Sequence, residues 1–247
     1  MKKLPFCIGI MFSNLALAET VSINWMVGGS VYDTTSCTVG DTLNIPATNP
    51  TRYGYTFRGW ATDFLQLEYI SSSGIQWIDT GVTPSENIKI EVVGKQNKKD
   101  SALFGVSNKL YLFAANETQT FYGYGNLTGS FSENIANPLT SQKTIIMSKA
   151  DGLVIDGTTY VNFSNVASFN SPYTITLFGR RLNDTGGVAK LGDTTIYYCK
   201  IWENGILVRN LIPAKRSSDA HIGMFDTVSQ TFFENAGSGA FIAGPNL

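Results

Sequence analysis

Apolar and polar residues alternate with a period of two through most of this chain. Clear runs of this kind stand at residues 88–92, 110–113, 173–178 and 195–202. Because successive side chains of a strand point to opposite faces, each run predicts a strand with one buried face. Few windows beyond about ten residues keep the apolar spacing of a helix without Gly, Pro or β-branched interruptions. The sequence therefore predicts an all-β protein.

Two dipeptides predict tight hairpins. Asp156-Gly157 and Asn204-Gly205 each lie between two runs of strand-forming residues. Both dipeptides supply the positive φ angles that a type I′ turn needs. Asp156 is accordingly interpreted as a turn residue and not as a catalytic or metal-binding carboxylate.

The N-terminal segment has the pattern of a secretory signal. Two lysines precede the mostly apolar residues 4–15, and Ala16-Leu17-Ala18 provides the small-x-small pattern that signal peptidase accepts. The apolar stretch is shorter than the about 20 residues that span a bilayer. We expect residues 1–18 to be a signal peptide. The mature chain is then expected to be secreted, periplasmic or at the cell surface, without membrane insertion after cleavage.

The charge of the chain limits the classes of partner that it can bind. Charged residues make up 15% of the sequence and the net charge is −1. The adjacent basic pairs at 98–99, 180–181 and 215–216 form no continuous stripe and are interpreted as solvated surface. Nucleic acid and anionic membrane are disfavoured as main partners because neither would be held by counterion release.

Two cysteines remain after the expected signal cleavage, and two states are open to them. Cys37 and Cys199 could pair in an oxidising compartment. However, they fall in regions that we interpret as separate domains, and Cys199 lies inside the strand-like run 195–202. A buried, unpaired Cys199 is favoured because a free cysteine behaves as a small hydrophobic residue.

Residues 19–62 have a sequence pattern that differs from that of the rest of the chain. A short strand at 21–26 is followed by Gly28-Gly29, and residues 50–60 read Pro-Thr-Arg-Tyr-Gly-Tyr-Thr-Phe-Arg-Gly-Trp. This pattern resembles the Listeria-Bacteroides repeat, the internalin-type B repeat. The resemblance implies one compact β-grasp-like spacer of the kind found in bacterial surface proteins. Its aromatic residues are interpreted as the core of a very small domain.

From residue 64 onward a second resemblance covers nearly the whole chain. It rests on segments such as Gln-Trp-Ile-Asp-Thr-Gly and Phe-Phe-Glu-Asn-Ala-Gly-Ser-Gly. These segments stand at 67–70, 76–81, 199–205, 207–216, 222–226 and 232–239. They are similar to a concanavalin A-like, laminin-G-like domain that is widespread in gut-bacterial surface proteins and phage tail proteins. The resemblance implies a jelly-roll β-sandwich over residues 64–247.

No motif of an enzyme stands out. Retaining glycosidases need two carboxyl groups about 5 Å apart, which a strand provides at positions i and i+2 or i+4. The nearest pairs, Glu86 with Glu91 and Asp151 with Asp156, are five positions apart and would point to opposite faces. A dyad from distant strands stays open but has no supporting feature. His221 is the single histidine. The sequence contains no Gly-x-Ser-x-Gly motif whose serine it could activate, so it is interpreted as a loop residue.

Metal sites have little support. One histidine and two separated cysteines cannot complete a closed zinc site. Calcium is possible at a loop rim, with Asp184 and Asp193 as candidates. Neither residue lies in a spaced acidic loop, so ordinary turn roles are favoured. No other cofactor is expected.

The leading functional hypothesis is a non-catalytic module for glycan recognition or adhesion. Sugars present an apolar face and many hydroxyls, which an aromatic platform with a flanking amide matches. If Phe121 faces the core, Tyr122, Tyr124 and Asn126 share the opposite face and form a candidate ligand-binding row.

Two alternatives remain open at this point. The two tyrosines can instead pack under a covering loop, because aromatic residues of a strand often bury against their neighbours. The chain can also be a structural or protein–protein interaction domain of a surface protein, without a glycan ligand. A sandwich whose outer face lacks a concave aromatic cluster would favour this second alternative. The expected partner is accordingly a glycan or a surface protein.

Overall fold

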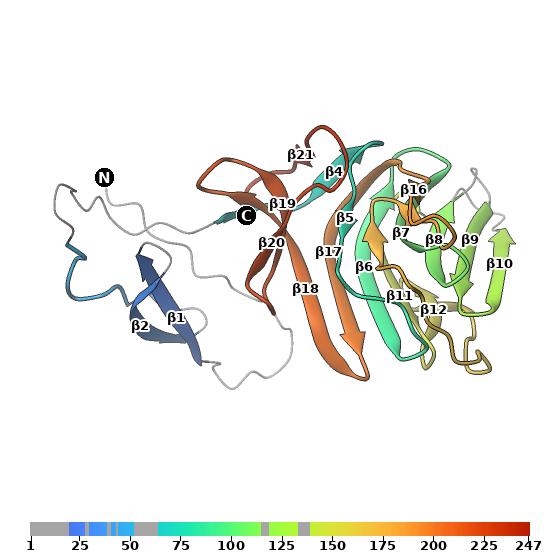
Figure 1. Cartoon of the computed structure of the whole chain (residues 1–247), viewed down its shortest axis with the longest axis horizontal. Coiled ribbons are helices and arrows are strands. Elements are labelled where there is room, and N and C mark those ends of the chain that lie inside the picture. The colour runs from blue at the N-terminus through green and yellow to red at the C-terminus, as the bar shows by residue number, and fades with distance from the viewer. Residues whose placement is uncertain are drawn as a thin grey trace. The chain divides into compact units, whose positions relative to one another are not determined.

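The computed structural model describes residues 20–27, 30–38, 41–42, 44–51, 64–114, 119–132 and 139–247 (Figure 1). These ranges contain strands, turns and loops and no helix, which confirms the all-β prediction. The chain divides into two compact units, Met1–Asp63 and Phe64–Leu247. The expected signal peptide and residues 52–60 of the repeat motif lie outside the described residues. Within the described ranges, no helix is long and apolar enough to cross a membrane.

The smaller unit contains an antiparallel hairpin of β1 (Thr20–Val27) and β2 (Ser30–Thr38). The strand expected at residues 21–26 lies within β1. Trp25 and Cys37 are buried. The indole Nε1 of Trp25 donates a hydrogen bond of 2.8 Å to Thr35 Oγ1, which ties the two strands together through their side chains.

The larger unit contains two sheets in its described residues. The first sheet, which we call the front sheet, has the order β10 (Leu127–Ser132), β9 (Gln119–Tyr124), β8 (Leu110–Ala114), β7 (Ser101–Val106), β14 (Thr176–Leu177) and β5 (Ile78–Asp79). The short strands β15 (Arg180–Arg181) and β16 (Val188–Ala189) pair with each other, and β15 also pairs with β7. These two strands form a small hairpin at the side of the front sheet.

The second sheet, the back sheet, is larger. Its main order is β13 (Thr158–Val161), β12 (Gly152–Ile155), β11 (Lys143–Ser148), β6 (Ile88–Gln96), β17 (Asp193–Glu203), β18 (Ile206–Arg216), β19 (Ile222–Asp226) and β20 (Thr231–Phe233). The strands β3 (Phe64–Gln66), β4 (Ile70–Ser73) and β21 (Ile242–Ala243) join this sheet off the main path. Figure 1 shows the long strands β6, β17 and β18 side by side.

One apolar core draws on both sheets. Ile90 of β6 and Ile201 of β17 come from the back sheet, and Phe104 of β7 and Leu112 of β8 come from the front sheet. All four side chains are fully buried. Cys199 of β17 is a free thiol in the same core, which confirms its interpretation as a buried, unpaired residue. Burial raises the pKa of this thiol well above its ordinary value.

Most of the expected strands are present, and one is much shorter than expected. Residues 88–92, 110–113 and 195–202 lie in β6, β8 and β17. Of residues 173–178, only Thr176 and Leu177 form a strand. Phe178 has a φ of 64°, in the left-handed region that ends an extended run. The alternation at 173–178 therefore reflects buried positions in a loop as well as in a short strand.

The two hairpin predictions are confirmed. Asp156 and Gly157 have φ angles of 48° and 80° and join β12 to β13. Asn204 and Gly205 have φ angles of 51° and 78° and join β17 to β18. Positive φ at both central residues is the geometry of a type I′ turn, whose twist matches that of the flanking strands.

Candidate binding site

The expected row of exposed tyrosines is not formed. Tyr124 is fully buried in the core between the sheets, and Tyr122 is half-buried against the same core. Phe121 lies on the other face of the front sheet, where it packs against Phe113 with ring centroids 5.2 Å apart. The prediction that both tyrosines face away from the core is wrong. Asn126 is exposed, and its Oδ1 accepts a bond of 3.3 Å from the backbone N–H of Ala167.

The surroundings of Tyr124 explain its orientation. Its hydroxyl lies 3.0 and 2.8 Å from the carbonyl oxygens of Glu86 and Ile88 and accepts a bond from the N–H of Lys149. Its ring stacks on Phe163 with centroids 4.8 Å apart. Burial raises the pKa of Tyr124 to about 12. Tyr124 is a hydrogen-bonded residue of the core and not a sugar platform.

The acidic residues of the two candidate pairs have separate partners. Glu86 accepts a bond from Ser168, and Glu91 accepts one from the Tyr198 hydroxyl. Asp151 accepts a bond from Ser148 and is paired with Lys89 at 3.0 Å. Asp156 is paired with Lys143 at 2.7 Å, and this contact holds the pKa of Asp156 below its ordinary value. Each carboxylate therefore has a structural contact of its own.

His221 belongs to an exposed charged cluster. Its Nδ1 lies 2.9 Å from Asp219 Oδ2, and Asp219 is held by the guanidinium of Arg216 at 2.5 Å. Arg216 also pairs with Glu234. The Arg216 contact lowers the pKa of Asp219 well below its usual range. This cluster presents acids, a base and a fixed cation but no hydroxyl or thiol nucleophile.

The candidate metal ligands are dispersed. In the part of the chain that the structure describes, no group of three or more His, Cys, Asp or Glu residues is placed to hold a metal ion. Asp184 is exposed in a turn. Asp193 Oδ1 accepts a bond of 2.8 Å from the amide of Asn97.

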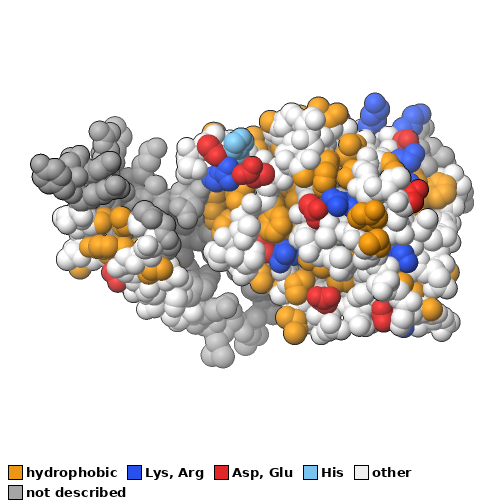
Figure 2. Space-filling model, in the orientation of Figure 1, with side chains coloured by type: hydrophobic (Ala, Val, Ile, Leu, Met, Phe, Trp, Pro, Cys, Tyr) orange, Lys and Arg blue, Asp and Glu red, His pale blue; other side chains and the backbone are white. Residues whose placement is uncertain are grey.

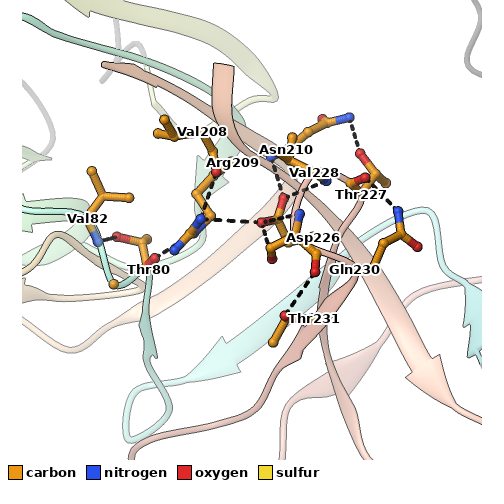
Figure 3. Close-up of polar contacts among 12 residues, drawn as sticks. Thr80, Val82, Val208, Arg209, Asn210, Asp226, Thr227, Val228, Gln230 and Thr231 are labelled. Atoms are coloured by element: carbon orange, nitrogen blue, oxygen red, sulfur yellow. Dashed lines mark hydrogen bonds and ion pairs between the residues drawn. The ribbon is translucent and has the colours of Figure 1, made fainter. Parts of the chain in front are cut away.

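A buried carboxylate, Asp226, forms the most extensive polar network in Figure 3. It is fully buried and lies 3.6 Å from Nη1 of Arg209. Its oxygens accept bonds from the backbone N–H groups of Asn210, Val228 and Ser229, and from the Ser229 hydroxyl. These donors occupy both carboxylate oxygens, so the network fixes β18 against the end of β19.

A pocket of about 320 Å³ lies where three loops meet at one end of the larger unit. Residues 73–74 stand at the end of β4, residues 98–101 run from the β6–β7 connection into the start of β7, and residues 191–193 run into the start of β17. Ser73 is exposed and carries a hydroxyl, Ser101 is buried with its hydroxyl directed at the Lys99 carbonyl oxygen, and Asp193 carries a carboxylate. The pocket is therefore polar and is built from segments far apart in the sequence.

Two side-chain cations at this pocket have no partner among the described residues. Lys98 and Lys99 are exposed, and neither ammonium group makes a hydrogen bond or ion pair there. Asp100, between them and β7, instead pairs with Lys190 at 2.6 Å. The pocket thus offers two ammonium groups to a ligand. In Figure 2, Lys and Arg side chains gather with some acidic ones at the end of the larger unit where Figure 1 labels β7 and β16.

An aromatic row lies beside this pocket on the outer face of the front sheet. Tyr111, Phe113 and Phe121 follow one another with ring centroids 5.9 and 5.2 Å apart. The guanidinium of Arg180 stands 5.1 Å from the Tyr111 ring and 4.9 Å from the Phe113 ring. Lys190, which pairs with Asp100 of the pocket, lies 5.7 Å from the Phe113 ring. Lys190 therefore connects the pocket to the aromatic row.

The sequence contained one signal for this row. Residues 110–113 read Leu-Tyr-Leu-Phe, so both faces of that strand are apolar. A strand with two apolar faces indicates that the outer face is also covered or used. The sequence carries no such signal for Arg180, because its contacts with the rings depend on tertiary packing.

Comparison with known proteins supports the first resemblance. The family model of the Listeria-Bacteroides repeat domain matches residues 22–89. The match ends in β6, beyond the last residue of the smaller compact unit, and this repeat occurs in surface or extracellular proteins. The concanavalin A-like resemblance and the expected domain boundaries stay predictions. A search of curated proteins finds no match to this chain.

Proposed function

We propose that this protein is a non-catalytic, secreted or cell-surface module whose larger unit binds a glycan at the pocket formed by residues 73–74, 98–101 and 191–193. The observation that carries the proposal is the pocket itself. It presents the Ser73 hydroxyl, the Asp193 carboxylate and two lysine side chains that have no partner among the described residues, together at one end of the larger unit. An aromatic row begins directly beside it.

The chemistry of the pocket suits a sugar. Sugar hydroxyls both donate and accept hydrogen bonds, so they need mixed polar groups in a fixed arrangement. The exposed Ser73 hydroxyl and the Asp193 carboxylate can accept hydrogen bonds, and the two lysines donate. An apolar drug-like ligand would instead need a mostly hydrophobic lining. Loops held at the ends of strands are the usual place for such recognition groups.

The state of the acidic residues supports a non-catalytic role. Glycoside hydrolysis requires one carboxyl group that can donate a proton and a second that is free to attack or to activate water. Asp151 and Asp156 are each held by a lysine, and Glu91 is held by a tyrosine hydroxyl. Asp193 stands alone in the pocket as the single carboxylate without an ion pair there. One such group is insufficient for this chemistry.

A glycan array tests the proposal directly. The full chain is applied to the array as wild type and as the double variant Lys98→Ala/Lys99→Ala, with calcium or with a chelator. The variant is expected to lose at least about tenfold in affinity for the glycan that binds best, because two charge-assisted hydrogen bonds are removed. Its melting temperature should stay unchanged, since neither lysine has a partner in the described residues.

A matched control removes two positive charges elsewhere. Lys109 lies in the turn at the opposite end of β7, and Lys215 is an exposed residue of the back sheet. Lys109→Ala/Lys215→Ala should keep the binding of the wild type. Equal losses in the two double variants, or an array with no bound glycan, would reject the pocket as a glycan site.

A further inference from the structure

Arg180 stands out among the cations around the aromatic row because it has no anionic partner in the described residues. Its neighbour Arg181 pairs with Asp79 at 2.8 Å, and Lys190 pairs with Asp100 at 2.6 Å. Among the described residues, the Arg180 side chain makes ring contacts only, with Tyr111 and Phe113. Its Nε, like that of Arg181, is buried and has no hydrogen-bond partner there.

Such an environment leaves the guanidinium incompletely satisfied. A buried N–H group without an acceptor carries the cost of its lost hydration. The ring contacts return part of that cost, because aromatic faces attract cations. They supply no hydrogen-bond acceptor for the fork of N–H groups. An anion that presents two oxygens side by side, such as a carboxylate or a sulfate, can accept two parallel bonds from this fork, as in bidentate arginine–carboxylate and arginine–phosphate pairs.

The rings hold Arg180 in a defined position. Tyr111 and Phe113 are only 6% and 7% exposed, so neither ring can swing out of the row. The Tyr111 ring lies directly over Gly123 of β9, where any side chain would collide with it. Phe121 extends the row and is half-buried, so part of its ring is open to a ligand. The guanidinium is therefore presented on a preformed surface.

This surface is continuous with the proposed pocket. Asp100 lines the pocket, its partner Lys190 lies over Phe113, and Arg180 lies over the same ring. The Lys190–Asp100 pair is thus the boundary between the pocket and the Arg180 surface. A chain of sugars that starts in the pocket and crosses this pair reaches Arg180 and the ring of Phe121.

We propose that the glycan is acidic, and that Arg180 is the specificity-determining residue that binds the carboxylate or sulfate of a sugar next to the one in the pocket. This inference rests on the proposed function. The apolar face of the same sugar lies along the exposed part of the Phe121 ring, while Lys98 and Lys99 bind the residue in the pocket. The anionic group accepts hydrogen bonds from the terminal Nη groups of the guanidinium, which are not buried like Nε.

The test compares each acidic oligosaccharide with its own neutralised form. Tetragalacturonate and its methyl ester form one pair, and a sulfated oligosaccharide and its desulfated form a second, so the two anions are distinguished. By calorimetry with the full chain, the wild type should bind at least one acidic member about tenfold or more tightly than its neutral counterpart. Arg180→Gln should bind both members of that pair equally.

Two further variants keep the test decisive. Arg180→Lys retains the charge over the rings but loses the bidentate geometry, so it should fold and show a reduced preference for the acid. Lys215→Gln, with the same loss of charge at a remote site, should keep the full preference. A wild type that binds neutral and acidic members equally would overturn the role of Arg180 and leave the proposed function standing. An absence of binding to every glycan would overturn both.

Discussion

Replacing Tyr124 by Phe removes one hydroxyl from the core and leaves the stacked ring in place. The backbone N–H of Lys149 then loses its acceptor, and the carbonyls of Glu86 and Ile88 lose their shared donor. A buried polar group without a partner costs about 1–3 kcal/mol. Because at least two such groups result, the free energy of unfolding at pH 7 should fall by about 2–3 kcal/mol.

The pH dependence of this loss has a definite sign. Burial raises the pKa of the Tyr124 hydroxyl from 10.0 to about 12. The folded state therefore holds the proton more tightly than the unfolded state. The resulting stabilisation is complete below pH 10 and is lost as the pH rises to 12. Two pKa units correspond to about 2.7 kcal/mol, so the stabilities of the wild type and of Tyr124→Phe should converge near pH 12.

Urea unfolding followed by tryptophan fluorescence between pH 7 and pH 12 measures both effects. Tyr69→Phe is the matched control, because the Tyr69 hydroxyl makes no hydrogen bond with the described residues. This control should stay within about 0.5 kcal/mol of the wild type. A Tyr124→Phe variant as stable as this control at pH 7 would refute the argument. Parallel stability curves for the wild type and Tyr124→Phe above pH 10 would also refute it.

Three further predictions concern the larger unit. Asp226→Ala should lower the free energy of unfolding in urea by about 3–5 kcal/mol, because Arg209 then stays half-buried without its carboxylate; a loss below about 1 kcal/mol would contradict this. Gly157→Ala should cost about 1–2 kcal/mol by the same assay, because φ is 80° and no contact compensates; unchanged stability would argue against the type I′ turn. Cys199 should resist a thiol reagent in the native protein and react after unfolding, since burial both shields the thiol and raises its pKa; peptide mapping that finds it labelled under native conditions would disprove this.

The sequence was sufficient for features that depend on neighbouring residues. Asp156-Gly157 and Asn204-Gly205 determine their hairpins because only a few residue types adopt positive φ at both positions of a two-residue turn. The strands at 88–92 and 195–202 follow from the alternation of apolar residues, which any strand with one buried face must show. The free, buried state of Cys199 followed from its place inside such a strand.

Where both faces of a strand are apolar, the alternation of residues cannot predict which face is buried in the core. Residues 121–124 have aromatic side chains on both sides, so alternation alone could not decide whether Phe121 faces the core or Tyr122 and Tyr124 do, as the structure shows. The carbonyls and the N–H group that hold the Tyr124 hydroxyl come from residues 86, 88 and 149, far away in the sequence.

The candidate site shows the same division between sequence and tertiary structure. The all-β class and the repeat motif were evident in the sequence, because they depend on local patterns of residues. Lys98-Lys99 and the pair at 180–181 were recognisable only as basic dipeptides. These basic residues come close to Phe113 and Asp100 only because the β6–β7 connection and the β15–β16 hairpin lie together at one end of the sandwich. Long-range strand pairing brings these segments together, and a side chain's missing partner is defined only after every neighbour has been placed.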